Sequence, residues 1–155
     1  MIYKNTYTYN LIFIVAVFLF NSCNKNDTLF NQLDVKKTSV DFINKLTDTP
    51  DLNVLTYLYY YNGAGVTVGD YNNDGLEDIY LVANQGKNKL YINKGNLKFE
   101  DVTEGDIVDE QGWSTGVTSV DINNDGLLDI YICKSGKIKD ENKSRNELLI
   151  NQGND

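Results

Sequence analysis

The chain has 155 residues, with 22 acidic and 14 basic side chains, a formal net charge of -8 and no histidine. The acidic balance argues against a nucleic-acid partner, which needs a basic surface. The lack of histidine excludes Ser-His-Asp catalysis and every histidine-dependent metal site, while 41% hydrophobic residues are enough for the core of one domain.

The first element along the chain, residues 1–22, is predicted to be a signal peptide. Lys4 is the only charged residue before an unbroken apolar run at residues 11–20. A membrane-spanning helix needs roughly 20 apolar residues, so this shorter run fits the core of a signal peptide better.

Cys23 follows this run directly, after Asn21 and Ser22. The pattern resembles the cleavage site of bacterial lipoproteins, which implies cleavage after Ser22 and a lipid on Cys23. That resemblance implies an outer-membrane lipoprotein of the bacterial cell envelope, facing the periplasm or the surface, with the membrane as a partner. The alternative is an ordinary signal peptide followed by a chance cysteine. The second cysteine, Cys133, lies in an apolar stretch and is expected to be buried without a disulfide.

Residues 23–50 are expected to form a lipid-anchored tether and N-terminal segment, and residues 51–155 to hold repeats. At the start of the second part, residues 54–61 (VLTYLYYY) are rich in residues that favour strands and could form an outer strand. Their four tyrosines either pack against a sheet or stack on a ligand.

One unit then occurs twice. Residues 70–78 (DYNNDGLED) return as residues 121–129 (DINNDGLLD), and the flanking residues on both sides repeat as well. The second copy carries additional residues within a charged stretch at 134–146, which is expected to be an exposed loop.

Short strands are expected around each loop. In the first unit they are residues 66–68, 79–83, 90–92 and 98–103, separated by turns rich in glycine and asparagine. Four strands in about fifty residues is the size of a β-propeller blade. The predicted fold is therefore all-β, with about two four-stranded blades at 63–104 and 114–155, the second incomplete. Because such units are stable only when stacked, we expect a fragment of a larger propeller or a chain that must assemble.

The acidic loops are predicted to hold two Ca²⁺ ions. Oxygen atoms recur at positions 1, 3, 5, 7 and 9 of each loop, with a glycine at position 6 for the turn, and all-oxygen sets suit a hard cation. The candidate ligands are the side chains of Asp70, Asn72, Asp74, Asp78, Asp121, Asn123, Asp125 and Asp129 and the carbonyls of Leu76 and Leu127.

Other classes of calcium loop fit the two loops less well. An EF-hand needs a bidentate glutamate at position 12 between two helices, but that position is Leu81 or Ile132 and a strand-like segment follows. Dockerin-type loops also need an acid at position 12. Either loop alone is also consistent with a turn that holds no metal ion. The occurrence of the same loop twice favours calcium.

Together, the nine-residue loop DxNxDGxxD and its flanking strands resemble the FG-GAP repeats of integrin-like propellers and the VCBS-type repeats of bacteria. Residues 60–155 also resemble the propeller of bacterial proteins that end in an ASPIC/UnbV domain. The resemblance implies that each loop connects the first two strands of a blade and that the eight side chains named above are calcium ligands.

Two function classes follow. The first is a calcium-stabilised binding or scaffold module that presents loops to a glycan or a protein, with Trp113 and residues 134–146 as candidate contacts; Trp113 is alternatively a packing residue between blades. The second is part of a secreted polysaccharide hydrolase or lyase, although catalysis by this chain is not expected. A glycosidase needs two carboxylates about 5–10 Å apart, and no spacing selects a pair. The candidate carboxylates outside the ligand positions are Glu77, Glu100, Asp101, Glu104, Asp106, Asp109 and Glu110.

Overall fold

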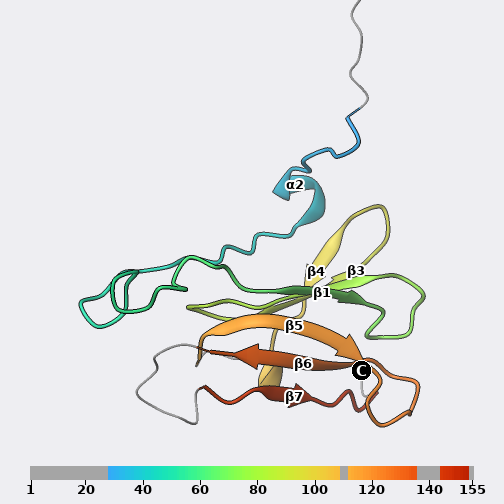
Figure 1. Ribbon diagram of the computed structural model, residues 1–155. Coiled ribbons are helices and arrows are strands. Elements are labelled where there is room, and N and C mark those ends of the chain that lie inside the picture. The colour runs from blue at the N-terminus through green and yellow to red at the C-terminus, as the bar shows by residue number, and fades with distance from the viewer. Residues whose placement is uncertain (1–27, 109–111, 136–143, 154–155) are drawn as a thin grey trace, which may run out of the picture. The chain divides into compact units, whose positions relative to one another are not determined.

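The computed structural model describes residues 28–108, 112–135 and 144–153 (Figure 1). The chain divides into two compact units, Met1–Gln32 and Leu33–Asp155. In the described part of the first unit, Thr28 donates a hydrogen bond to the Asn31 side chain at 2.8 Å. The predicted signal peptide and Cys23 lie outside the described residues. Among the residues that are described, no helix is long and apolar enough to span a bilayer.

The second unit contains two antiparallel sheets, as Figure 1 shows. The first sheet follows chain order, with β1 (Val66–Gly69), β2 (Asp78–Leu81), β3 (Lys89–Asn93) and β4 (Phe99–Asp101). The short 3₁₀ helix η1 (Gly105–Ile107) precedes the second sheet, which holds β5 (Ser114–Val120), β6 (Asp129–Lys134) and β7 (Glu147–Leu149). This confirms the predicted all-β fold, with one four-stranded and one three-stranded sheet consistent with propeller blades.

Local turn chemistry places the strands. In each acidic loop an asparagine and a glycine adopt positive φ, at Asn73 and Gly75 in the first and at Asn124 and Gly126 in the second. Glycine has no Cβ to clash there, and asparagine tolerates the same region. The strand registers then pair Gly69 with Asp78 and Val120 with Asp129, which brings both ends of each loop together.

The hydrophobic core lies between the two sheets. Its buried members from the first unit of the repeat are Tyr71, Tyr80, Val82, Leu90 and Ile92, and those from the second are Ile130 and Ile132. At this interface β1 and β5 run close together, because a Cβ added to Gly65 would lie only 2.9 Å from the Cα of Gly116. Apolar burial between neighbouring sheets is the interaction on which repeat units depend.

A strap, residues 41–47, binds the turn between β2 and β3. Asn44 and Asn84 exchange two hydrogen bonds of 2.7 and 3.0 Å. The backbone N–H of Thr47 donates to Gln85 at 2.7 Å. Before the strap, Asp34 caps the one-turn helix α2 (Val35–Thr38) by accepting from the N–H of Lys36. Part of the predicted tether is therefore fastened to the first sheet.

The predicted outer strand at 54–61 is wrong, because residues 51–62 form successive turns. The side chain of Asn53 accepts the N–H of Leu55 at 2.9 Å, and its carbonyl accepts the N–H of Tyr57 at 2.9 Å. These local bonds compete with strand pairing. They also place Tyr57 and Tyr60 on Trp113, with ring centroids 5.5 and 5.2 Å away.

Lys134 and Cys133, both in β6 of the second sheet, lie differently from what the sequence predicts. The charged stretch at 134–146 does not begin as an exposed loop, because Lys134 ends β6 with its side chain buried and its ammonium paired with Glu147. Residues 136–143 lie outside the described part of the chain. Cys133 is a free thiol that is half-buried rather than buried, since its side of β6 is not covered by the first sheet.

Candidate functional site

The first acidic loop folds around its own backbone amides. The Asp70 carboxylate accepts the N–H groups of Asp74 at 3.0 Å and Gly75 at 2.8 Å. Asn72 Oδ1 accepts the N–H of Asp74 at 3.2 Å, and Asp74 Oδ1 accepts the N–H of Leu76 at 2.9 Å. The oxygens of positions 1, 3 and 5 are thereby gathered over one short stretch of backbone.

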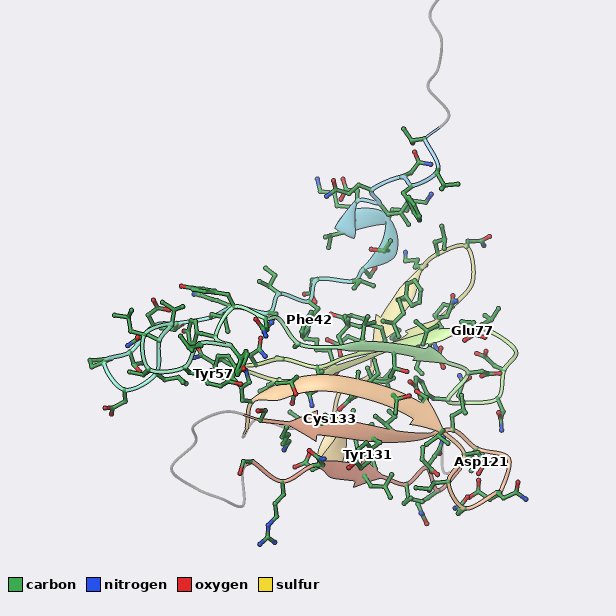
Figure 2. The ribbon with its side chains drawn as sticks, viewed as in Figure 1. Phe42, Tyr57, Glu77, Asp121, Tyr131 and Cys133 are labelled. Carbon is green, nitrogen blue, oxygen red and sulfur yellow. The ribbon has the colours of Figure 1, made fainter. Side chains whose placement is uncertain are left out.

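The second loop repeats this arrangement bond for bond. Asp121 accepts the N–H groups of Asp125 at 3.1 Å and Gly126 at 2.9 Å. Asn123 accepts the N–H of Asp125 at 3.1 Å, and Asp125 accepts the N–H of Leu127 at 2.9 Å. Figure 2 shows Glu77 of the first loop and Asp121 of the second at the same end of the two sheets. The same local sequence has thus produced the same geometry twice.

The last carboxylate of the first loop has a different environment. Asp78 is fully buried at the start of β2, and its two oxygens accept the N–H groups of Tyr71 at 3.0 Å and Asn93 at 2.8 Å. Burial raises the pKa of Asp78; the two amide bonds oppose the shift, and the charges of Asp74 and Asp70 add to it. The Asp78 carboxylate therefore joins the acidic loop to the start of β2 and to the end of β3. Its negative charge is repelled by the charges of Asp74 and Asp70.

Asp129 makes the same pair of bonds in the second sheet. It is also fully buried and accepts the N–H groups of Ile122 at 3.0 Å and Asn151 at 2.9 Å. Sequence reasoning assigned both final carboxylates only to a metal ion. The structure adds a second role, the joining of one hairpin to the next, which depends on contacts between residues far apart in the chain.

The loops fit a hard cation by their donor chemistry. Carboxylate, amide and carbonyl oxygens make up the predicted sets, and such sets suit Ca²⁺. In the described ranges, no three carboxylate or thiol groups gather closely enough to form a metal cluster by themselves. An ion would therefore also need the oxygens of Asn72 and Leu76, or of Asn123 and Leu127, and a share of the buried carboxylates. The assignment of all ten ligands stays a prediction.

Trp113, the predicted ligand contact, and the carboxylates outside the ligand positions have the following surroundings. Trp113 is 2% exposed and packs on the tyrosines described above, which favours the packing interpretation over direct ligand contact. Among the carboxylates outside the loops, Glu100 pairs with Lys94 at 3.0 Å and Asp101 with Lys89 at 2.6 Å. The side chains of Asp106, Asp109 and Glu110 lie outside the described part of the structure.

An ionic network that the sequence did not indicate fastens the strap. Asp41 accepts the hydroxyl of Tyr91 at 2.8 Å and the ammonium of Lys89 at 3.2 Å. These bonds, from Tyr91 first and then Lys89, hold the pKa of Asp41 below its usual value. The contacts join residues about fifty positions apart, and no local pattern reports such a pairing.

A groove of about 520 Å³ lies between the sheets, near the acidic loops. Its walls are mainly apolar side chains of the two sheets, with Leu90 and Ile92 on one side and Leu128 and Leu149 on the other. Asn151 adds a polar group. No motif in the sequence indicated this groove, because it arises from the packing of the two sheets.

The comparisons with known proteins find similarity in the region that holds the two acidic loops. Residues 70–132 match the family model of the FG-GAP-like repeat. The chain is also 36% identical over 72 residues to Cartilage acidic protein 1 of Xenopus tropicalis, an alignment that covers 46% of this chain and 11% of the relative. The alignment thus spans a small part of the curated relative's length. Residues 70–132, from the first acidic loop to β6, are therefore similar to the FG-GAP-like repeat family.

Proposed function

We propose that this chain is a calcium-stabilised binding or scaffold module of the bacterial cell envelope. The observation that carries the proposal is the duplication of one loop geometry, with the same carboxylate and amide oxygens placed over the same backbone positions. A single acidic turn would be ordinary surface structure. Two matching copies at the same end of neighbouring sheets favour a shared ligand chemistry.

The first ion would be held by Asp70, Asn72, Asp74, the Leu76 carbonyl and Asp78, and the second by the corresponding residues 121–129. A bound Ca²⁺ supplies positive charge that offsets the repulsion among these carboxylates. Extracellular calcium modules typically bind at about 10⁻⁴–10⁻³ M. Such affinity suits an exported protein, and the proposed lipid on Cys23 would hold it at the outer membrane.

The ligand of the module is proposed to be a glycan or a protein. Because Trp113 is buried, the surface best suited to contact a ligand is the turn segment 54–61. Tyr59 and Tyr61 are 62% and 63% exposed there, beside the exposed Leu55 and Leu58. Exposed aromatic groups near one another are typical of interaction sites. The similarity to bacterial ASPIC/UnbV-domain proteins stays a prediction, and no specific observation in the described residues favours the hydrolase alternative.

Calcium titration tests the proposal. Isothermal titration of the chelator-treated chain with CaCl₂ should show two sites. The double variant Asp70→Ala, Asp121→Ala should show neither, whereas each single variant should lose one. The variant Glu104→Gln, which changes an exposed acid outside the loops, is the matched control and should bind like the parent. Equal heats in parent and double variant would contradict the proposal.

A further inference from the structure

We infer that Asn62 is a site of spontaneous chemical modification, at which the backbone nitrogen of Gly63 converts the side-chain amide into aspartate and isoaspartate. The chain contains an Asn-Gly pair once, at residues 62–63. Glycine after asparagine favours this reaction, because it has no Cβ to hinder the approach of its nitrogen to the neighbouring side chain. The inference goes beyond the proposed function and does not depend on calcium.

The structure leaves both reacting groups without hydrogen bonds. The side chain of Asn62 is exposed, and it has no hydrogen-bond partner among the described residues. The N–H of Asn62 itself donates to the Tyr59 carbonyl at 3.1 Å, whereas the N–H of Gly63 has no acceptor within the same part of the chain. Nothing lies within 4 Å of the position that a Cβ on Gly63 would occupy. No bond therefore has to break before the Asn62 side chain turns toward the Gly63 nitrogen.

The reaction balances with water as its co-reactant. The Gly63 nitrogen forms a bond to Asn62 Cγ, the bond from Cγ to Nδ2 breaks, and the proton of the Gly63 nitrogen leaves with Nδ2 as ammonia. Because the two groups are neighbours in the chain, the attack is intramolecular. Water then opens the resulting succinimide ring. Opening at Cγ gives aspartate with the ordinary backbone, and opening at the main-chain carbonyl gives isoaspartate, whose backbone runs through Cγ.

The Asp-Gly pairs of the acidic loops provide an internal comparison. Aspartate before glycine forms the same succinimide, with loss of water instead of ammonia. At residues 74–75, however, the nucleophile is bound, because the N–H of Gly75 donates to the Asp70 carboxylate at 2.8 Å. The Asp74 side chain is also held, since it accepts the N–H of Leu76 at 2.9 Å. The second loop repeats both bonds. Folding is thus expected to protect these pairs and to leave residues 62–63 reactive.

Isoaspartate at residue 62 lengthens the backbone next to a buried junction. The Gly63 carbonyl accepts Asn84 Nδ2 at 2.8 Å, and the same nitrogen donates to the Ser114 carbonyl at 2.8 Å. Asn84 is 1% exposed and also exchanges two hydrogen bonds with Asn44 of the strap. An extra backbone carbon between residues 62 and 63 displaces the Gly63 carbonyl from this junction. Isoaspartate is therefore expected to loosen the attachment of the turn segment 54–61 to the sheets.

Aspartate at residue 62 keeps the backbone length and changes only the charge. Residues 52–69 contain no charged side chain, so the new carboxylate brings negative charge to a neutral stretch, next to the exposed Tyr61. Figure 2 shows Tyr57 of the turn segment at the opposite end of the sheets from Glu77 and Asp121. The modification therefore alters the aromatic surface and leaves the acidic loops as they are.

Timed incubation of the full chain at mildly alkaline pH, in chelator and mild detergent, tests the inference. Digestion followed by chromatography and mass spectrometry measures the conversion of Asn62 and of Asp74, in the folded chain and in guanidinium chloride. The folded rate at Asn62 should lie within about tenfold of its denatured rate. The folded rate at Asp74 should fall by more than about tenfold, because the Gly75 nitrogen is bound. Each residue is compared with itself, which removes the intrinsic difference between asparagine and aspartate.

Two variants complete the test. Asn62→Gln has a longer side chain that forms the corresponding ring far more slowly, so it should release little ammonia. Freshly prepared Asn62→Asp should melt like the parent, whereas the isoaspartate fraction isolated from the aged parent should melt at a lower temperature.

A folded parent chain that keeps Asn62 intact while the denatured chain converts it would overturn the inference. Equal slowing of Asn62 and Asp74 on folding, or ammonia release from Asn62→Gln at the parental rate, would overturn it as well. An isoaspartate fraction that melts like Asn62→Asp would overturn the predicted loosening at Asn84.

Discussion

The carboxylate of Asp129 accepts the backbone N–H of Asn151 at 2.9 Å and so joins the start of β6 to the chain that leaves β7. Asp78 and Asn93 form the same bond at 2.8 Å in the first sheet. In both sheets, a fully buried aspartate at the start of one strand thus holds the chain at the end of the following strand.

Asp129→Ala is predicted to destabilise the fold even without calcium. The change leaves the partly buried N–H groups of Ile122 and Asn151 without acceptors, and each such loss costs up to about 1–3 kcal/mol. Urea denaturation in the presence of a chelator should therefore show a free energy of unfolding lower by about 2–5 kcal/mol. Asp125→Ala, at an exposed acid in the same loop, should change it by less than about 1 kcal/mol. Equal effects would mean that the buried carboxylate does not hold the hairpin.

Gly65→Ala is predicted to weaken the packing between the sheets. The added Cβ would lie 2.9 Å from the backbone of Gly116 and Val117, and backbone cannot move aside like a flexible side chain. Overpacking of this kind costs about 1–3 kcal/mol. Denaturation of dilute protein should show the loss for Gly65→Ala and little change for Gly116→Ala. A stable Gly65→Ala variant would show that the two sheets do not approach this closely.

The prediction from sequence succeeded where short-range chemistry decides the structure. Asn73 and Gly75, and their counterparts in the second loop, fix turns whose positive φ few other residues accept, so the flanking strands could be placed within a few residues. The all-β fold followed from those turns and from apolar alternation.

It failed where distant residues decide the structure. Residues 54–61 have strand-forming side chains, yet the packing of Tyr57 and Tyr60 on the distant Trp113 supports local bonds to Asn53 that hold the segment in turns. The strap depends on Asp41 finding Lys89 and Tyr91, and the burial of Lys134 depends on Glu147. These pairings are absent from any local window of sequence.

The strap is predicted to loosen in acid. The pKa of Asp41 in the folded chain lies below its ordinary value of 3.8. Stabilisation by the carboxylate is therefore complete above pH 3.8 and is lost as the pH falls through the lower, folded value. Hydrogen exchange should show that the Thr47 amide, bonded to Gln85, loses protection in that range. Asp41→Asn should show reduced protection already at neutral pH. A parent chain whose Thr47 protection is independent of pH would contradict this account.

Cys23→Ser is predicted to change where the protein resides. Without the thiol no lipid can be attached, so the variant should leave the membrane fraction as a soluble or uncleaved form. Cell fractionation followed by immunoblotting measures this, with Cys133→Ser as the control that should fractionate like the parent. Should Cys23→Ser stay in the membrane fraction as well, the lipid anchor is not at this residue.

The melting curve of the chain in chelator, in CaCl₂ and in MgCl₂ tests the central claim most directly. A ligand that binds only the folded state stabilises it by RT ln(1 + [L]/Kd), about 2.7 kcal/mol at a hundredfold excess over Kd. Calcium should therefore raise the melting temperature clearly. Magnesium should raise it little, because Mg²⁺ demands a tighter octahedron and retains its waters. Three superimposed curves would contradict the account, because the acidic loops around Asp70 and Asp121 would then hold no ion.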